Sequence, residues 1–282
     1  MSKRTARKAV SYLILTLGVL VVAFPFFWML TTSLQTEQET YSSPPTVVPA
    51  SPQWRNYPDA WRNAAPGSSG EITFATYFRN SFFVALCVTA GVLFTSILAA
   101  YAFAFMEFPG KGVLFTILLS TMMIPFEVTL VPNYSTIVAL GWYDTFPALI
   151  VPWMANVFSI FILRQFFKGI PRDYYEAAQI DGCGDWRFMW QVATPMAAPA
   201  LATITIFTFL ASWNAFLWPL IVTRSPERFV VQVGLAFLTS AESTNTNMVM
   251  AASAIVIIPV IVLYLILQRR FIEGVAGTGL KG

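Results

Sequence analysis

Long runs of residues without any charge limit what this chain can fold into. No Asp, Glu, Lys or Arg occurs in the runs Ala9–Thr36, Asn80–Met106, Thr145–Leu163, Phe188–Thr223 and Ser243–Gln268. One helix needs about 20 apolar residues to cross the core of a bilayer. Charged residues make up only 11% of the chain, against about a quarter in soluble domains. The sequence therefore predicts an all-α integral membrane protein.

A further apolar stretch, 112–143, is interrupted only by Glu127. We therefore expect six transmembrane helices, at about 10–33, 79–106, 113–137, 145–167, 197–223 and 247–268. This divides the chain into an N-terminal helix with a long loop (1–78), a five-helix core (79–268) containing a loop at 168–195, and a tail (269–282).

The basic residues predict the orientation of these helices. With six spans both termini lie on one side, and that side holds twelve of the 17 Lys and Arg residues. The five on the other side are Arg55, Arg62, Arg79, Arg224 and Arg228. Since basic residues concentrate on the cytoplasmic side of a membrane, both termini and the 168–195 loop are expected to be cytoplasmic.

Several kinds of catalytic or cofactor site are excluded by composition. The chain has no histidine and only two cysteines, so it lacks a histidine-based triad and a four-thiolate metal site. No G-x-x-x-x-G-K-[ST] sequence occurs; Gly110-Lys111-Gly112 and Gly279-Leu280-Lys281-Gly282 lack the required spacing. We therefore expect a non-catalytic chain with no resident metal or cofactor.

The two loops on the outer side carry little chemistry. The loop at 34–78 is rich in proline, with a Gly67-Ser68-Ser69-Gly70 segment, and is expected to be extended and rich in turns. It forms either an outer cap without chemistry or a docking surface for an extracytoplasmic partner. The segment 224–242 contains an apolar stretch, 229–238, that predicts a re-entrant or interfacial element.

The cytoplasmic loop predicts two short helices. Pro171 suits the first turn of a helix over 172–180, and Gly182 suits its C-terminal stop. Asp185 is predicted to cap the second helix, and Pro195 to open the fifth span. One face of that second helix is expected to carry Trp186, Met189, Trp190 and Ala193.

The segment Glu176-Ala177-Ala178-Gln179-Ile180-Asp181-Gly182, followed by Pro195, resembles the E-A-A…D-G…P loop of ABC importer permeases. The similarity extends along nearly the whole chain, towards the smaller partner subunit of the maltose-permease type. The motifs that carry it include Asn80-Ser81, Pro125 to Pro132, Trp213-Asn214-Ala215-Phe216-Leu217-Trp218-Pro219 and the tail Gln268-Arg269-Arg270-Phe271-Ile272-Glu273-Gly274. Cys183 departs from the pattern, since alanine is usual there.

This resemblance implies a type I importer permease of a prokaryotic inner membrane that acts through other subunits. The expected partners are a second permease in a heterodimer, two ATPase subunits that bind ATP and Mg²⁺, and an extracytoplasmic binding protein. The residues expected to couple this chain to the ATPase are Tyr174, Glu176, Ala177, Ala178, Asp181 and Gly182. The tail residues Gly279, Leu280 and Lys281 are expected to contact the ATPase as well.

Four residues are candidates for contact with the cargo. Glu127 is the only carboxylate within an apolar span, where ionisable residues are often functional; alternatively it lies at the outer interface and bonds to backbone freed by a proline. The fifth span is the most polar, with Thr208, Ser212 and Asn214 near two tryptophans, a combination that suits a sugar. The tryptophans are equally consistent with an interfacial belt.

Two other classes of protein fit the sequence less well than an importer. A secondary transporter usually carries intramembrane ionisable relays or inverted repeats, and here only one carboxylate is embedded. A membrane enzyme or scaffold is less consistent still, because no paired carboxylates or G-x-S-x-G sequence occur. Within the importer class, the sequence leaves open an oligosaccharide, a monosaccharide, a polyol or glycerol phosphate as cargo.

Overall fold

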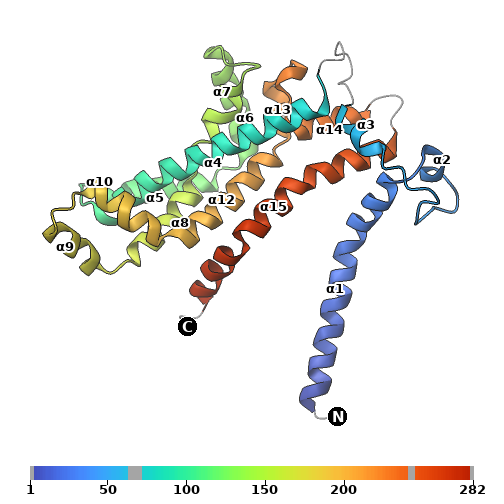
Figure 1. Ribbon diagram of the computed structural model, residues 1–282. Helices are drawn as coiled ribbons and strands as arrows, with labels where there is room; N and C mark the ends of the chain where they lie inside the picture. Colours follow the sequence, from blue (N-terminus) through green and yellow to red (C-terminus); the bar gives the residue numbers. More distant parts are fainter. Residues whose placement is uncertain (1–2, 63–71, 241–244, 280–282) are drawn as a thin grey trace. The chain divides into compact units, whose positions relative to one another are not determined.

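The structure, a computed structural model, describes residues 3–62, 72–240 and 245–279. Within them the regular structure is helical (Figure 1). The longer helices are α1 (Lys3–Ser33), α4 (Phe74–Phe105), α5 (Lys111–Ser120), α6 (Phe126–Ala139), α8 (Val157–Lys168), α9 (Arg172–Ile180), α12 (Ala198–Trp213), α14 (Val231–Ser240) and α15 (Thr246–Gly279). The short ones are α2 (Glu37–Thr40), α3 (Asn56–Arg62), α7 (Phe146–Ile150), α10 (Asp185–Phe188), α11 (Thr194–Met196) and α13 (Leu217–Val222), with single turns η1 (Thr121–Met123), η2 (Val151–Trp153), η3 (Met189–Ala193) and η4 (Pro226–Arg228).

The membrane-crossing segments agree with the expected six spans. Four stretches are long and apolar enough to cross a bilayer: Val10–Ser33, Phe74–Phe105, Phe146–Lys168 and Thr246–Gln268. Two bent pairs bring the number to six if each pair counts as one span: Lys111–Met123 with Phe126–Ala139, and Asp185–Met196 with Ala198–Trp213.

Three spans expected to be continuous are broken. The span 145–167 is interrupted at 154–156, between η2 and α8. The predicted span 113–137 bends by 99° between η1 and α6, because Pro125 lies in an extended conformation and begins α6 as its N-cap. The predicted span 197–223 ends as α12 at Trp213 and resumes only at Leu217 as α13. Pro195 does not open it: this proline lies in α11, and Pro199 occupies the first turn of α12 instead.

The chain forms two compact units. The first consists of Met1–Ala75 and Gly234–Ile258, and the second of Thr76–Val233 and Pro259–Gly282. In the first unit, the side chain of Asn56 donates to the carbonyls of Ser33 (2.8 Å) and Gln35 (3.0 Å). Asn247 donates to the same Gln35 carbonyl at 3.1 Å. These bonds fix the loop that follows α1. Over residues 10–24 the apolar side chains of α1 itself are exposed, as expected for contact with lipid.

In the second unit, α4 and α12 form the core that positions the candidate site. Asn80 at the start of α4 donates to the carbonyls of Glu227 (2.8 Å) and Phe229 (3.0 Å), and Ser81 accepts from the backbone N–H of Val231. Residues 229–238, expected to form a re-entrant or interfacial element, lie mostly in helix α14. Figure 1 shows α9 and α10 at one end of this unit and α6, α7 and α13 at the other.

Candidate functional site

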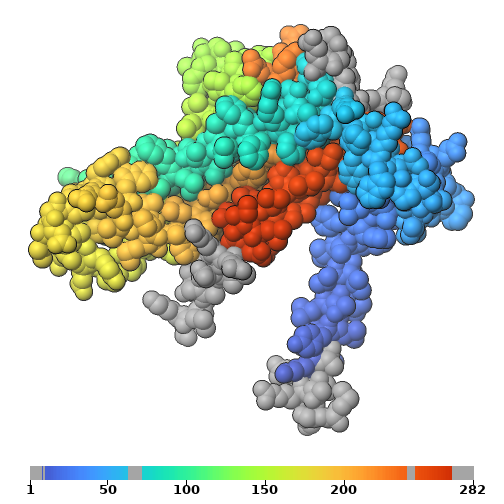
Figure 2. All heavy atoms as spheres, in the orientation of Figure 1, coloured from blue at the N-terminus to red at the C-terminus, as the bar shows by residue number. Residues whose placement is uncertain are grey.

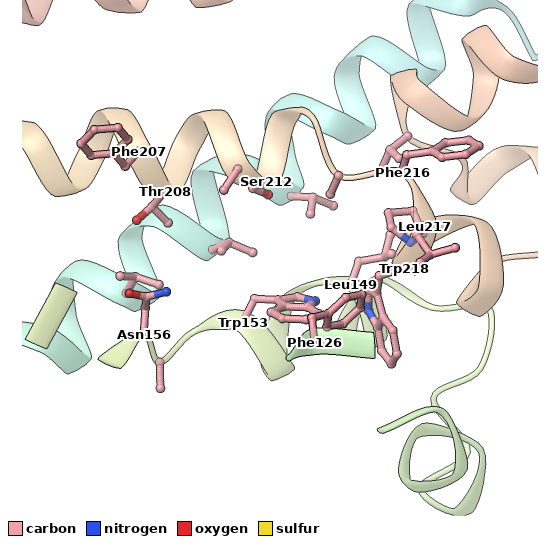
Figure 3. A pocket seen from close by; sticks show the side chains of 18 of the residues that line it. Phe126, Leu149, Trp153, Asn156, Phe207, Thr208, Ser212, Phe216, Leu217 and Trp218 are labelled. Carbon is pink, nitrogen blue, oxygen red and sulfur yellow. The ribbon is translucent and has the colours of Figure 1, made fainter. Parts of the chain in front are cut away.

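A cavity of ≈ 670 Å³ lies within the second unit. Its walls come from α4, from the segment that runs from α7 through η2 to the start of α8, from α12 and from α13, with Phe126 of α6 completing them. Figure 3 shows Phe207, Thr208 and Ser212 along one helix, with Asn156, Trp153 and Phe126 opposite. The cavity has the size of a small-molecule site.

Breaks in two of the spans form the cavity. Helix α8 begins after an interruption at 154–156, where the side chain of Asn156 caps it by accepting from the backbone N–H of Ser159 at 2.9 Å. On α4, the hydroxyl of Thr95 donates to the carbonyl of Met154 at 2.7 Å. Gly91, one turn away, has no side chain to displace Met154: a Cβ there would lie 2.7 Å from Met154 Cγ. A small residue and a hydroxyl on α4 thus hold the interruption in place.

The polar groups that line the cavity have unused hydrogen-bonding capacity. Elsewhere on α12, the hydroxyls of Thr203 and Thr205 donate to the carbonyls four residues earlier, at 3.0 and 2.7 Å. The hydroxyls of Thr208 and Ser212 face the cavity and have no hydrogen-bond partner in the described part of the chain. The amide nitrogen of Asn156 likewise has none there. These three side chains are available to a polar molecule.

Aromatic rings form much of the remaining wall. Trp153 packs edge to face against Trp218, with ring centroids 5.8 Å apart, and lies 5.4 Å from the ring of Phe126. The indole N–H of Trp218 donates to the carbonyl of Ala148 at 2.9 Å, so this buried ring is fixed in orientation. Among the described residues that line the cavity, none is charged.

A loop contact joins α7 and α13, two of the helices that line the cavity. Asp144, in the left-handed conformation with φ 59°, accepts from the backbone N–H groups of Arg224 (2.9 Å) and Ser225 (3.0 Å) and from the Ser225 hydroxyl. Its own N–H donates to the carbonyl of Val222 at 2.8 Å. Burial alone would raise the pKa of Asp144, but the hydrogen bonds from Ser225 and Arg224 outweigh it and the pKa is lowered.

Of the four predicted cargo residues, the structure brings Thr208 and Ser212 to the cavity. Glu127 lies in the first turn of α6, is exposed, and is not among the lining residues. Asn214 is the C-cap of α12 and also lies outside the lining, where it accepts from Gln232 at 3.5 Å. A role in cargo contact for Glu127 and Asn214 therefore remains a prediction from the sequence.

Asn156 and Trp153 line the cavity but were not predicted to do so, because the sequence predicts one continuous helix over 145–167. A local signal was present. Asn156 is followed three residues later by Ser159, and asparagine is a favoured N-cap. Read as a helix start, this pattern would have placed the interruption at 154–156.

Of the residues predicted to couple this chain to an ATPase, Tyr174, Glu176, Ala177 and Ala178 lie on α9, which buries none of its side chains. Asp181 and Gly182 follow in the turn that ends this helix. Tyr174 is 54% exposed and Ile180 is 87% exposed, and Glu176 and Ala177 are exposed beside them. Figure 2 shows this helix, in yellow, uncovered at one end of the second unit. These exposed side chains, which include the apolar Ala177 and Ile180, are available for contact with another protein.

The turn that ends α9 requires glycine. Gly182 has φ +76°, its N–H donates to the carbonyl of Gln179 at 3.0 Å, and the N–H of Cys183 donates to the carbonyl of Ala178 at 2.8 Å. This pair of bonds is the Schellman motif, in which a left-handed residue closes the helix. The predicted stop at Gly182 is therefore confirmed.

The second short helix differs from the prediction in its cap and its face. Gly184 occupies the N-cap, and Asp185 is the first helical residue. Residues 189–193 form a π-helical turn, which has more residues per turn than an α-helix and shifts the register. Met189 and Ala193 are therefore buried while Trp186 is 64% exposed, so the four residues predicted to share one face do not.

The predicted ATPase-contacting tail can be placed only in part. Gly279 is the last residue of α15. Leu280 and Lys281 lie outside the described residues, so their predicted contact rests on the sequence alone.

The chain matches a family model described as the binding-protein-dependent transport system inner membrane component, over residues 91–276. It is 32% identical over 278 residues to the sn-glycerol-3-phosphate transport system permease protein UgpE of Brucella abortus (strain 2308), covering 98% of each chain. The corresponding protein of Pectobacterium atrosepticum is 33% identical over 270 residues, 95% of each chain. A solved bacterial ABC transporter involved in the import of the acidic polysaccharide alginate contains a similar fold, with a TM-score of 0.85, 23% identity, and coverage of 96% of this chain and 98% of that one.

The expected class and location are confirmed by these matches: a non-catalytic, multi-pass permease of a bacterial inner membrane. Such a permease belongs to a system with ATPase subunits, a binding protein and a second permease. This chain is a member of the family of inner membrane components of binding-protein-dependent ABC importers.

Proposed function

We propose that this chain forms one half of the translocation path for a neutral, polyhydroxylated cargo, a sugar or a polyol. The observation that carries this proposal is the lining of the cavity, which combines aromatic rings with the unused polar groups of Asn156, Thr208 and Ser212. Apolar C–H faces of a sugar pack on aromatic rings, and its hydroxyls need donors and acceptors at fixed positions.

Glycerol 3-phosphate is a second candidate, because the UgpE permeases are similar to this chain over 95% or more of its length. A phosphate group is usually bound by arginine, lysine or helix N-termini. The described lining residues include no cation. If the cargo is a phosphate ester, its anionic end is contacted by the partner permease, while this chain contacts its hydroxyls.

Coupling to ATP hydrolysis is assigned to the loop at 171–192. ATP and Mg²⁺ bind to two separate ATPase subunits, whose closure displaces α9, and the attached spans turn the path from inward-facing to outward-facing. Glu176 and Tyr174 lie on the exposed surface of α9, where they can enter a cleft of the ATPase. Asp181 and Gly182 set the direction of α9, and the tail at 279–281 adds a second contact with the ATPase subunits.

The experiment is purification of the tagged chain from its native membrane with its associated subunits. We expect a second permease and an ATPase to co-purify, and Glu176→Ala to weaken that association. Asp173→Ala is the matched control, since it removes another carboxylate from the first turn of the same helix. Recovery of the chain alone, or equal loss in both variants, would contradict the coupling assignment.

The cargo is tested on the same complex in proteoliposomes supplied with its binding protein. Labelled maltose, glucose, glycerol and sn-glycerol 3-phosphate are offered separately, and ATP-dependent uptake of each is measured. Uptake of an uncharged sugar or of glycerol supports the neutral cargo. Uptake of glycerol 3-phosphate alone would favour the second candidate.

A further inference from the structure

Five aromatic rings meet where the exposed helix α9 joins the membrane spans. They are Tyr101, Phe105, Phe167, Tyr175 and Phe188, which we call the aromatic joint. The ring of Tyr175, on α9, lies 5.7 Å from that of Phe105 on α4 and 5.1 Å from that of Phe188 on α10. The ring of Phe105 lies 6.1 Å from that of Phe167 on α8. The joint therefore brings four helices together at one point.

A single carboxylate oxygen links three of these helices. Asp185 Oδ1, at the start of α10, accepts from the hydroxyl of Tyr175 at 2.7 Å and from the hydroxyl of Tyr101 at 2.9 Å. Hydrogen bonds to an ionised acceptor are about twice as strong as neutral ones. The bond to Asp185, together with burial, raises the pKa of the Tyr175 hydroxyl.

Helix α9 has few other attachments to the unit. None of its nine residues is buried, and its ion pair, between Arg172 and Glu107 at 3.9 Å, joins two side chains that are more than 70% exposed. Exposed pairs of this kind contribute little. Tyr175 thus supplies the main side-chain connection from α9 to the spans.

Helix α4, which the aromatic joint connects to α9, also forms a wall of the cavity. Tyr101 and Phe105 belong to α4, whose residues Val84, Val88 and Val92 line the cavity. Tyr101 follows Val92 by nine residues, which is about 14 Å along a helix. A displacement of α9 that reaches Tyr101 is therefore delivered along one uninterrupted helix to the cavity.

We propose that Tyr101, Tyr175 and Asp185 are positioning residues that make α9 and α4 move as one body during transport. The inference rests on the proposed coupling role of α9 and deepens it. The fourth and fifth spans flank the loop, and the chain itself connects them to α9. The hydrogen-bonded joint adds the second span, which is distant in the chain, as a direct carrier of that movement.

The test measures the movement at the cavity without requiring the cargo. In a variant lacking Cys87 and Cys183, Ala211→Cys on α12 places a thiol at the cavity lining. The labelling rate of this thiol by a maleimide is measured in the complete complex, with and without a non-hydrolysable ATP analogue. The ratio of the two rates reports the nucleotide-dependent change.

The double variant Tyr101→Phe/Tyr175→Phe keeps both rings and removes both hydroxyls. A hydrogen bond to a charged group is strong enough to shift an equilibrium by about tenfold, so we expect the nucleotide-dependent ratio to fall by about that factor while ATPase subunits still co-purify. Tyr143→Phe is the matched control, since it removes a tyrosine hydroxyl that lies outside α9 and outside the cavity lining and that bonds to nothing in the described chain, and it should leave the ratio unchanged.

Two substitutions of the acceptor complete the test. Asp185→Asn retains an oxygen that accepts a hydrogen bond from each of the two hydroxyls, so the ratio of labelling rates should stay close to the wild-type value. Asp185→Ala removes this acceptor, so the nucleotide-dependent difference in labelling rate should be lost. A wild-type ratio in the double Phe variant, or an equal loss in Asp185→Asn and Asp185→Ala, would overturn the inference. If the unsubstituted complex shows no nucleotide response, or if no ATPase co-purifies with it, the proposed coupling function itself has failed.

Discussion

The aromatic joint and the cavity lie in the same unit but use their polar groups in opposite ways. In the joint, the hydroxyls of Tyr101 and Tyr175 are both bonded to Asp185. In the cavity, the hydroxyls of Thr208 and Ser212 are bonded to nothing in the described part of the chain. Satisfied polar networks make a region rigid, and unused groups are free to bind a molecule that passes. The difference matches the two roles proposed above, in which the joint transmits movement and the cavity contacts the cargo.

The largest effect is expected where α4 supports the interrupted span beside the cavity. In Gly91→Val, the new side chain would collide with Met154, whose Cβ already lies 2.9 Å from a Cβ placed at position 91. Overpacking of this kind costs about 1–3 kcal/mol, and we expect uptake to fall by about tenfold. The measurement is ATP-dependent uptake in proteoliposomes, with Gly18→Val as a control on α1, where a Cβ meets nothing within 4 Å. Wild-type uptake in Gly91→Val would show that the interruption does not depend on this close contact.

A somewhat smaller effect is expected at the turn after α9. Gly182→Val forces a β-branched residue into the left-handed region, which costs about 1–2 kcal/mol, and should reduce both uptake and stimulated ATPase activity. Gly184 provides a matched control, because its φ is −73° and a Cβ there also meets nothing within 4 Å. Equal loss in Gly182→Val and Gly184→Val would attribute the effect to bulk at the surface rather than to backbone conformation.

The unused hydroxyls of the cavity give the third prediction. Thr208→Val or Ser212→Ala should each raise the KM for uptake several-fold, since one hydrogen bond contributes about 0.5–1.5 kcal/mol, and should leave thermal stability unchanged. Thr205→Val removes a hydroxyl that is bonded within the helix and lies outside the lining, so its KM should stay at the wild-type value. A rise in KM for Thr205→Val as large as for Thr208→Val would remove the distinction between used and unused hydroxyls.

The fourth prediction concerns the outer ends of α7 and α13, where Asp144 is held by Arg224 and Ser225. Because the pKa of Asp144 is lowered in the folded protein, its stabilisation is complete above the ordinary aspartate pKa of about 3.9. That stabilisation disappears as the pH falls through the lowered value. The unfolding temperature of the detergent-solubilised complex, measured from about pH 6 to pH 3, should therefore fall less steeply in Asp144→Asn than in the wild type. Identical slopes would assign the acid sensitivity to other carboxylates.

The smallest effect is expected from the double variant Glu127→Gln/Asn214→Ala. Both residues lie outside the cavity lining, so uptake should stay within about twofold of the wild type. A twofold change corresponds to a free energy smaller than the net contribution of one hydrogen bond. A large loss of uptake would instead support the contact with cargo that was predicted from the sequence, and would extend the path beyond the cavity.

The spans, the class of protein and the exposed helix at 172–180 were predictable from the sequence, since each depends on local pattern. Charge-free runs specify membrane segments because an unpaired charge is costly in hydrocarbon. Gly182 specifies a helix end because only glycine adopts its conformation without strain. The interruptions at 154–156 and 214–216 were not predicted, because the charge-free runs continue through them and each break is marked only by one asparagine.

What the tertiary structure alone decided is which polar groups find partners. Thr205 and Thr208 are alike in the sequence and lie on one helix, but only Thr205 bonds to the backbone. Likewise Tyr174 and Tyr175 are adjacent, yet only Tyr175 reaches Asp185 and the rings of α4. Hydrogen bonds depend on distance and direction in space. The partner of Thr205 lies one turn away on its own helix, whereas the partners of Tyr175 come from α10 and α4. The sequence by itself therefore determined that this is an importer permease with an exposed helix at 172–180, and the packing of its helices determined which polar groups bond to one another and which remain unused beside the cavity.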